Sequence, residues 1–495
     1  PTPLQRLNLP GIQAPVYAKR EDLGPIRAYK WRGAFNCMAA LSQEARDKGI
    51  VAASAGNHAQ GVALAARVLN CHATIFMPRS TPEVKQTEVR RHGGRHVKIM
   101  LHGDCYDETA AAAHEYTETH GCTFVHPYDD LVTMAGQGTL ADEVVMSGEG
   151  PFDRAYVAIG GGGLAASVAC WLKKFWPRIK VIGVEGIDQA SMKTSIEQGR
   201  RVNLDYVDVF CDGTAVHIPG ELTYPLCREL VDEFVTVTNN EVCQAIRAMW
   251  ESSRVVPEPS GAMSLAGFLK QWNRGEVKPE EKSFVVISGA NMDFTHLTQI
   301  ARQAGIGNHE TRYLRISMDS KRGQVLKYLR HIPQDTTLVD VQYGKTEGNT
   351  QHPVFGIAAS DEDLDTIRTT LKKKGIEFED ISEDDDVRFR MIHYQPELCQ
   401  HPLFVHIEFP ERAGAFLDFM ERIADLASLC YFNYTYTGER VGRALVGMEF
   451  DTAEDRETIR KRMGAFSKNI IRSIREISPE AFQRIMGSRQ LTVNH

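Results

Sequence analysis

Apolar and polar positions follow two rhythms along the first 305 residues. Strand-length, β-branched runs occur at Ala73–Met77, Ala155–Ile159, Lys180–Glu185 and Phe284–Ser288. Longer stretches with apolar residues at helical spacing lie between such runs, as at Glu108–Thr119 and Asn240–Ser252. Strands that alternate with helices predict an α/β layered fold with a mostly parallel sheet.

The pattern changes after about residue 312, where two segments repeat each other at a constant offset without a gap. The matched pairs are Ile316 and Ile407, Gly323 and Gly414, Leu326 and Leu417, Tyr343 and Tyr434, and Gly356 and Gly447. A register kept over this distance indicates a duplicated module. Each copy has the order strand, glycine turn, helix, strand, strand, helix, short strand, which is the split βαβ plan.

These patterns divide the chain into an N-terminal domain at 1–305, a linker at 306–311, and two ferredoxin-like α+β modules at 312–395 and 402–485. A duplicated split-βαβ module offers clefts between its copies where a small ligand can bind. The alternative is a pair of dimerisation modules that bind no ligand.

Composition narrows the class of protein. The 495 residues are 42% hydrophobic and 24% charged, as in globular proteins, and the net charge of -7 is not gathered in tails, which disfavours a nucleic-acid partner. Ten cysteines without a C-x-x-C pair favour a reducing, cytoplasmic environment. We expect no membrane span and see no signal peptide, but the chain starts at Pro1, so an organellar targeting segment stays open.

Lys30 is the first candidate for chemistry. It lies between the aromatic residues Tyr29 and Trp31 in the motif AYKWRGA. Aromatic neighbours can exclude water from an amine, which lowers its pKa and makes it nucleophilic. The alternative is an ordinary surface cation.

The second candidate is the motif SAGNHAQG, which begins at Ser54 and follows the strand-like run Ile50–Ala53. Backbone N–H groups at a helix start bind anions, so a carboxylate could dock around Gly56, Asn57 and His58. The alternative is a small-residue turn whose polar side chains are satisfied locally.

Four consecutive glycines, Gly160–Gly163, connect a strand to a helix. Glycines let backbone amides approach a phosphate beside the positive end of a helix. The loop also fits a dinucleotide fingerprint, with Gly160, Gly162 and Ala165 followed by Glu185 at a strand end. That nicotinamide alternative leaves Lys30 and the Asn57 motif without a role.

Two further motifs lie at element boundaries. In EPSGA, Ser260 after Glu258 is expected to be a plain helix N-cap. Ser288 closes a strand in SGANMDF, where a parallel sheet presents its ligands. No metal site is expected, because the polar groups from Glu185 to Ser191 form an incomplete set for a hard cation.

Taken together and in order, AYKWRGA, SAGNHAQG, GGGGLAA, EPSGA and SGANMDF resemble the biosynthetic threonine dehydratases (threonine ammonia-lyases), and the resemblance covers essentially the whole chain from Thr2. These are fold-type II, tryptophan-synthase-β-like enzymes that use pyridoxal 5'-phosphate. The resemblance implies dehydration and deamination of L-threonine to 2-oxobutanoate and ammonia in isoleucine biosynthesis, with L-serine as a possible second substrate, by a homotetramer.

The resemblance also assigns residue roles. Lys30 would bond covalently to the cofactor and take the Cα proton, while Asn57 would donate to the phenolic oxygen. The substrate-carboxylate loop would comprise Ser54, Gly56, Asn57 and His58. The phosphate cup would comprise Gly160, Gly161, Gly162, Gly163 and Leu164. Ser288 would face the pyridine nitrogen, and a neutral hydroxyl there favours direct elimination over transamination.

The repeated modules resemble the ACT-like regulatory pair of this family, which implies isoleucine and valine as opposing effectors. Two departures stand out: Ala28 replaces a common serine, and the first module reads MDSKRGQ where the second has the more typical FPERAGA. A catalytically inactive amino-acid sensor remains an alternative, which the intact Lys30, Asn57 and Ser288 disfavour.

Overall fold

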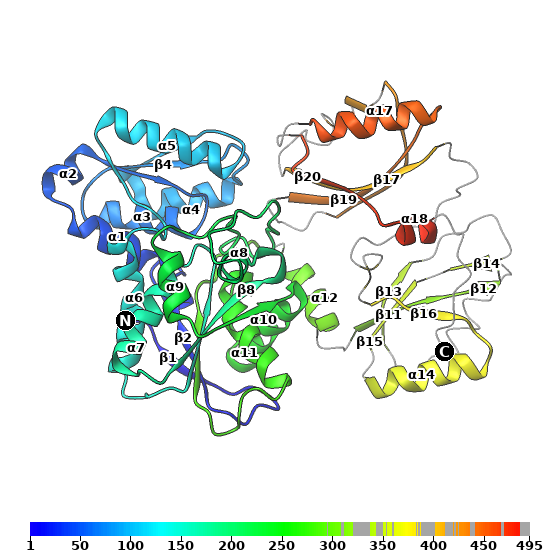
Figure 1. Cartoon of the computed structure of the whole chain (residues 1–495), viewed down its shortest axis with the longest axis horizontal. Helices are drawn as coiled ribbons and strands as arrows, with labels where there is room; N and C mark the ends of the chain where they lie inside the picture. Colours follow the sequence, from blue (N-terminus) through cyan, green and yellow to red (C-terminus); the bar gives the residue numbers. More distant parts are fainter. Residues whose placement is uncertain are drawn as a thin grey trace. The chain divides into compact units, whose positions relative to one another are not determined.

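The computed structural model describes residues 1–294, 296–307, 311–319, 337–342, 350–352, 354–358, 361–382, 384, 387, 401–410, 419, 422–423, 425–435, 441–466 and 470–485. The chain forms two compact units, Pro1–Ala304 and Gly305–His495, and each is described by itself (Figure 1). The segment 306–311, expected as a linker, includes the end of α12 (His296–Gly307) and the first residue of β11 (Thr311–Ile316).

Two sheets build the N-terminal unit. The larger has the order β1 (Leu4–Leu7), β2 (Val16–Arg20), β10 (Ser283–Ile287), β7 (Arg154–Ala158), β8 (Lys180–Gly186) and β9 (Glu233–Val237). Only its β1–β2 pair is antiparallel. The smaller sheet is fully parallel, with the order β5 (Val97–Leu101), β4 (Ala73–Met77), β3 (Ile50–Ala53) and β6 (Thr123–Phe124).

Helices surround both sheets (Figure 1). Besides α12 they are α1 (Lys30–Ala40), α2 (Gln43–Lys48), α3 (Asn57–Val68), α4 (Glu83–Gly93), α5 (Tyr106–His120), α6 (Leu131–Met146), α7 (Gly163–Phe175), α8 (Ser191–Glu197), α9 (Thr223–Leu230), α10 (Asn239–Ser253) and α11 (Pro259–Asn273). Short 3-10 turns occupy Glu21–Leu23, Gly94–His96 and Ile187–Gln189.

The predicted α/β fold is confirmed, and the individual elements agree closely. The strand expected at Ala73–Met77 has those bounds, and the helices expected at Glu108–Thr119 and Asn240–Ser252 lie within α5 and α10. The parallel strands divide between two sheets, since β3 to β6 pair only with each other before the chain returns to the larger sheet at β7.

Two strands of the larger sheet, β7 and β10, are held in place by burial on both faces. Every residue of β7 and β10 is buried, as expected for parallel strands covered on both faces. Alternate side chains enter opposite cores: Tyr156 packs with α10 and α11, whereas Val157 packs with α6 and α7. The two strands are therefore fixed from both sides, and the loops that leave their carboxyl ends start from rigid positions.

Among its described residues, the C-terminal unit contains two four-stranded sheets with the same topology and one two-stranded sheet. The first has the order β13 (Thr337–Gln342), β15 (Val354–Ala358), β11 and β16 (Phe378–Asp380). The second has the order β18 (Ser428–Thr435), β19 (Val441–Glu449), β17 (Leu403–Pro410) and β20 (Ser473–Glu476). All pairs are antiparallel. The remaining elements are β12 (Met318–Asp319), β14 (Thr350–Gln351), α14 (Asp361–Lys373), α17 (Ala453–Gly464) and α18 (Pro479–Ile485).

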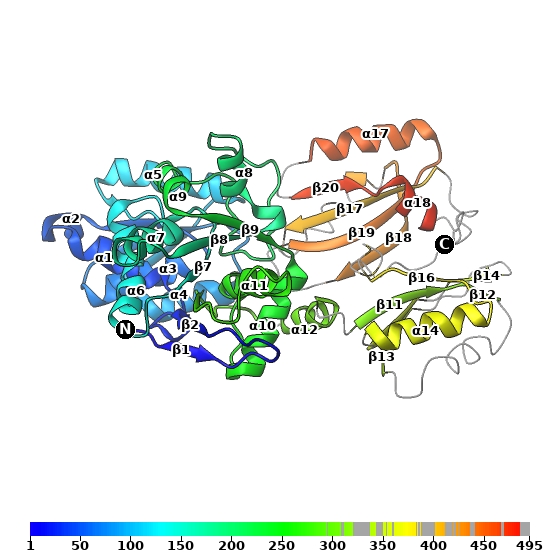
Figure 2. The same cartoon turned by 60° about the horizontal axis from the view of Figure 1, so that its bottom comes forward.

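In each module, a described helix packs on the four-stranded sheet. Helix α14 lies along the sheet that contains β11 (Figure 2). Leu314 and Ile316 of β11 form a buried cluster with Ile367 of α14. In the second module, Ile407 of β17 shares a cluster with Ile459 of α17. The matched pair Ile316 and Ile407 thus lies on the helix-facing side of each central strand.

The strand register repeats at the offset found in the sequence. Tyr313 pairs with Gly356 in the first sheet, and Phe404 pairs with Gly447 in the second. Both members of the second pair lie 91 positions after those of the first. A shift of one residue would move every side chain to the opposite face, so a shared register means that the two modules bury equivalent positions.

A β-bulge also recurs at the same offset, between Leu338 and Asp340 and again between Leu429 and Tyr431. Such bulges bend a strand at a defined place. Tyr434 lies in β18. The matched positions Gly323, Leu326, Tyr343, Gly414 and Leu417 lie outside the described residues.

Candidate functional site

Backbone pairing brings Lys30 to the carboxyl end of β10. The N–H of Tyr29 donates to the carbonyl oxygen of Ser288 at 3.0 Å. Ala28, which precedes Tyr29, forms an antiparallel β-bridge with Gly289, which follows Ser288. Helix α1 begins at Lys30 immediately after this contact, so its first side chain projects from a point fixed against the larger sheet.

The Lys30 amine is surrounded by protein although its side chain is only half-buried. Nζ donates to the carbonyl oxygen of Pro127 at 2.8 Å and lies 5.3 Å and 5.8 Å from the ring centroids of Tyr29 and Tyr128. Burial lowers the pKa of Lys30 to about 8. The predicted desolvation is confirmed, with Tyr128 as the second aromatic neighbour, whereas Trp31 packs in a cluster with Ile26 and other apolar residues.

The glycine loop connects β7 to α7, whose N-cap is Gly162 at φ +96°. Its carbonyl groups point to other partners: the oxygen of Gly161 accepts from the Thr223 hydroxyl and from the N–H of Gly220. Among the described residues, no acceptor is assigned to the backbone N–H groups from Gly160 to Leu164. Five free donors at a helix start form a site for an anion such as phosphate.

Glycine is required in this loop because neighbouring groups approach its backbone closely. A Cβ atom on Gly161 would lie 2.3 Å from the Tyr128 ring, and one on Gly160 would lie 2.9 Å from the Thr214 backbone. Tyr128 therefore contacts the glycine loop and also faces the Lys30 amine. The same ring joins two motifs that are far apart in the sequence.

The motif after β3 forms the start of α3. Ser54 Oγ accepts from the Gly56 N–H at 3.2 Å. The ring of His58 is buried, and its Nε2 lies 2.8 Å from the carbonyl oxygen of Val125. Burial, and then the nearby Lys30 amine, lower the pKa of His58 to about 3, so this imidazole is neutral at physiological pH.

Asn57 is held between two polar side chains that lie far away in the sequence. Its Nδ2 donates to Oε1 of Glu258 at 2.7 Å, and its Oδ1 accepts from Nδ2 of Asn291 at 2.7 Å. Glu258 is only 4% exposed, and its N–H donates to the Gly289 carbonyl oxygen. Asn57 is therefore tied to the segment that follows β10.

The Ser288 hydroxyl is buried and has one long contact, 3.4 Å from the Ser260 carbonyl oxygen. Strands β10 and β7 are neighbours in the sheet, so Ser288 and the glycine loop leave adjacent carboxyl ends. The structure thus brings Lys30, Asn57, Ser288 and the loop motifs into one region, linked by the contacts above.

The group types in this region fit a phosphorylated aldehyde. An amine of lowered pKa is available for the aldehyde carbon, and five free N–H groups beside a helix start are available for the phosphate. A buried hydroxyl without a short hydrogen bond is available for a ring nitrogen. Within the described ranges, no three His, Cys, Asp or Glu side chains are grouped in a way that could hold a metal ion.

Two sequence-based interpretations need correction. Ser260 was expected to cap a helix, but the N-cap of α11 is Glu258, without a side-chain cap bond, because Pro259 occupies the first helical position. Glu185 was the ribose-binding acid of the nicotinamide alternative. Its two carboxylate oxygens accept instead from the N–H groups of Met192 and Lys193, which caps α8. That acid is therefore already committed to a structural role.

Sequence reasoning missed Tyr128, Asn291 and the part played by Glu258. The partners of Glu258 and Asn291 are 201 and 234 positions away, so nothing local marks them. The available signal was that Glu258 is the first residue of the EPSGA motif and Asn291 the fourth residue of SGANMDF.

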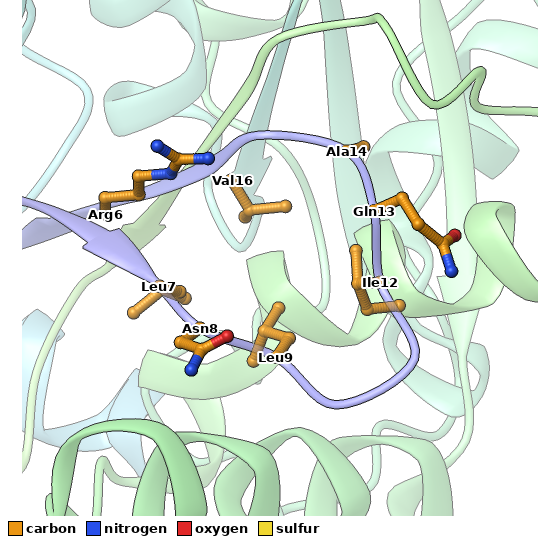
Figure 3. Close-up of a pocket in the computed structure, with 8 residues that line it drawn as sticks. All are labelled: Arg6, Leu7, Asn8, Leu9, Ile12, Gln13, Ala14 and Val16. Atoms are coloured by element: carbon orange, nitrogen blue, oxygen red, sulfur yellow. The ribbon is translucent and has the colours of Figure 1, made fainter.

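A separate cavity lies beside the N-terminal strands (Figure 3). It has a volume of about 310 Å³ and is lined by side chains between Arg6 and Val16. None of the predicted site residues lines it.

Across the described helices, none combines the length and apolar character needed to cross a membrane.

Comparisons with known proteins agree with this geometry. Residues 1–289 match the family of pyridoxal-phosphate dependent enzymes, and residues 399–472 match the C-terminal regulatory domain of threonine dehydratase. The chain is 36% identical over 452 residues to L-threonine dehydratase biosynthetic IlvA of Burkholderia multivorans, covering 90% of this chain and 88% of the relative. It is 34% identical over 471 residues to that of Escherichia coli, covering 94% and 90%.

Solved structures show the same relationship. The processed form of threonine deaminase isoform 2 from Solanum lycopersicum is 40% identical with a TM-score of 0.58, covering 61% of this chain and 88% of that one. Serine racemase from Dictyostelium discoideum is 28% identical with a TM-score of 0.54, covering 59% and 93%. Since the full-length relatives are similar across both halves, the chain belongs to the biosynthetic threonine dehydratase family of pyridoxal-phosphate-dependent lyases, with a C-terminal regulatory domain.

Proposed function

We propose that the chain converts L-threonine to 2-oxobutanoate and ammonia, with Lys30 as the catalytic amine. One observation carries the proposal most directly: a lysine whose pKa is lowered to about 8 lies at the carboxyl end of β10, beside a loop of free N–H groups. The relatives named above are threonine dehydratases. When bound, pyridoxal phosphate supplies a carbonyl group that bonds to amines and a ring that withdraws electrons from the substrate Cα.

Lys30 has two duties in this proposal. Its neutral amine would hold the cofactor through the aldehyde carbon and, when the substrate amine takes its place, would be free to accept the Cα proton. A pKa of about 8 leaves a useful fraction of the amine neutral near physiological pH while its conjugate acid can still return a proton. The carbonyl oxygen of Pro127 holds the amine in place through a hydrogen bond of 2.8 Å.

The start of α3 binds the substrate carboxylate in this proposal. The residues concerned are Ser54, Gly56, Asn57 and His58. The backbone N–H groups of Asn57 and His58 have no assigned acceptor among the described residues and lie at the positive end of the helix. A neutral His58 adds no positive charge that would favour a second anion.

The glycine loop binds the cofactor phosphate through the N–H groups of Gly160, Gly161, Gly162, Gly163 and Leu164. Asn57 donates to the phenolic oxygen, and Ser288 faces the pyridine nitrogen. A neutral hydroxyl does not stabilise a protonated ring, which would favour direct loss of the β-hydroxyl over transamination. The protonated Lys30 amine would supply the proton with which the hydroxyl leaves as water. Hydrolysis of the released enamine returns one water and gives 2-oxobutanoate and ammonia, which balances the reaction.

The regulatory part of the proposal assigns effectors to the modules at 312–395 and 402–485. Isoleucine lowers activity and valine opposes it, which requires each to bind one state of the enzyme better than the other. The shared register of the two sheets supports two equivalent modules. We further propose a homotetramer, for which sedimentation velocity of the full chain is the test.

One set of assays tests the activity. Wild-type protein loaded with pyridoxal phosphate should release ammonia and 2-oxobutanoate from L-threonine, and the Lys30→Ala variant should lose both the products and the visible absorbance of the bound cofactor. L-Serine in place of threonine measures substrate preference. Isoleucine and valine added to the full chain measure regulation. A Lys30→Ala protein with wild-type turnover would overturn the proposal.

A further inference from the structure

Three side chains form a hydrogen-bonded line along one edge of the site. Asn291 Nδ2 donates to Asn57 Oδ1, and Asn57 Nδ2 donates to Glu258 Oε1, both at 2.7 Å. Asn291 Nδ2 also donates to the carbonyl oxygen of Ile26 at 2.7 Å. The line therefore runs from the segment before α1, across the start of α3, to the start of α11.

The two ends of this line fix its direction. The Ile26 carbonyl can only accept a hydrogen bond, so the group that faces it must be the NH₂ of Asn291. The second hydrogen of that NH₂ points to Asn57, which must then present its oxygen on this side and its nitrogen on the other. Glu258 Oε1 is an acceptor there in either protonation state of the carboxyl group. The orientation of the Asn57 amide thus follows from the donor and the acceptor that face it.

A hydrogen count leaves one donor unused. Asn57 Nδ2 carries two hydrogens, and one goes to Glu258. The other has no assigned protein acceptor among the described residues. Had the amide been reversed, Asn57 would present a carbonyl oxygen in its place.

The charges around Glu258 are compatible with this arrangement. Burial, and then the carboxylate of Asp212, raise the pKa of Glu258 to about 8, while donation from Asn57 and the ammonium of Lys85 act in the opposite direction. Lys85 pairs with Asp212 at 2.8 Å. Tyr29 also feels the Glu258 charge, which adds to the burial that raises the pKa of its phenol.

We infer that Glu258 and Asn291 are positioning residues that lock the Asn57 amide with an N–H directed at the cofactor's phenolic oxygen. This inference rests on the proposed function, because it takes Asn57 as the residue that meets that oxygen. An N–H stabilises an anionic oxygen, whereas a carbonyl oxygen in the same place repels it. Neither positioning residue needs to touch the cofactor for this effect.

Substitutions at the two ends separate this role from packing. Glu258→Leu removes the acceptor, and Asn291→Asp replaces the donor by an acceptor of the same size, so each permits the Asn57 amide to reverse. Glu258→Gln keeps an oxygen that can accept from Asn57. Glu185→Gln is the matched control for loss of a buried carboxyl group, because Glu185 is fully buried but caps α8 away from this line.

The experiment titrates apoprotein variants with pyridoxal 5'-phosphate and follows visible absorbance and its dependence on pH. Glu258→Leu and Asn291→Asp should each bind the cofactor about tenfold more weakly, the effect of one charge-assisted hydrogen bond. Both should shift the pH midpoint of the visible band. Glu258→Gln and Glu185→Gln should retain wild-type affinity within about threefold and the wild-type midpoint. The dissociation constant and the midpoint do not require turnover.

The results of these experiments distinguish failure of the positioning role from failure of the proposed function. If Glu258→Leu and Asn291→Asp match the wild type in affinity and midpoint while Lys30→Ala loses the visible band, the positioning role is wrong and the proposed function stands. If Lys30→Ala retains full threonine turnover, the proposed function fails first. Should Glu258→Leu fail to fold, as judged by circular dichroism, the isosteric Asn291→Asp variant decides the question.

Discussion

The N–H of Tyr29 donates to the carbonyl oxygen of Ser288 at 3.0 Å, which joins two segments about 260 positions apart in the sequence. This one hydrogen bond places the start of α1 at the end of β10. Ser288 is a member of this hydrogen-bonded pair, and Lys30 directly follows the other member, Tyr29. The relative placement of the Lys30 and Ser288 backbones is consequently set by this pairing, and the hydrogen bond from Nζ to the Pro127 carbonyl oxygen then places the amine.

The lowered pKa of Lys30 gives a prediction about pH. An amine reacts with an aldehyde in its neutral form, and burial places the pKa of this amine at about 8, below the ordinary value of 10.5. The rate at which apoprotein gains visible absorbance with pyridoxal phosphate should therefore rise with pH to a midpoint near 8. Stopped-flow absorbance measures this rate. A midpoint near 10.5 would show that the amine is solvated like a surface lysine.

Gly161 offers a steric test of the loop. An alanine Cβ there would lie 2.3 Å from the Tyr128 ring, so the ring or the loop must move. We expect Gly161→Ala to weaken pyridoxal phosphate binding at least about tenfold and to destabilise the protein by about 1–3 kcal/mol, as overpacking does. Gly464→Ala is the control, since nothing lies within 4 Å of its Cβ position. Equal cofactor affinity in both variants would contradict a close-packed phosphate loop.

Much of the fold could be predicted from the sequence, because its signals are local. A buried strand such as Ala73–Met77 can be predicted from a short, mostly apolar run of residues. The duplicated C-terminal module can be predicted from matches at a constant sequence offset. Placing Lys30, Asn57 and Ser288 in one region depended on the family resemblance, since composition alone left a surface lysine and a plain turn as alternatives. No local sequence pattern marks the division of the parallel strands between two sheets.

The part that could not be predicted depends on long-range contacts. Ser260 was expected at an N-cap by residue type, but the fixed φ of Pro259 suits the first helical position, so the helix starts two residues earlier. Glu258 gains its role only from Asn57 and Asn291, and a single sequence contains no information about which residues meet across such distances. Polar networks of this kind are specified by tertiary packing.

Glu185 gives a prediction about stability and pH. Burial raises its pKa from 4.5 to about 8, against the opposing donation from the N–H groups of Lys193 and Met192. The folded state then binds more protons than the unfolded state, so its contribution to stability is full below pH 4.5 and is lost as the pH rises to about 8. The free energy of unfolding of wild type minus that of Glu185→Gln, measured by urea denaturation, should fall across this window. A flat difference would contradict the raised pKa.

Glu143 forms a cluster of ion pairs with Arg32 of α1 and with Lys19, and the effect of this cluster on stability can be tested. It accepts from Nη1 of Arg32 at 2.6 Å and from the buried Nζ of Lys19 at 2.5 Å. Burial alone would raise its pKa, but donation from Arg32 and Lys19 outweighs burial and lowers the pKa to about 2. Its stabilising effect is accordingly complete above pH 4.5 and is lost as the pH falls towards 2.

Replacing Glu143 by Gln leaves the buried Lys19 without its ion-pair partner and leaves Arg32 paired with Glu21 alone. We expect a loss of about 3 kcal/mol at pH 7, at the lower end for breaking a buried pair because Glu143 is 21% exposed. Glu44→Gln, which removes the exposed pair with Lys48, should cost less than about 0.5 kcal/mol. Urea unfolding at pH 7 and pH 3 measures both, and the Glu143→Gln penalty should shrink at pH 3. If it were the same at both values, the lowered pKa of Glu143 would be wrong and the cluster would stabilise α1 by packing alone.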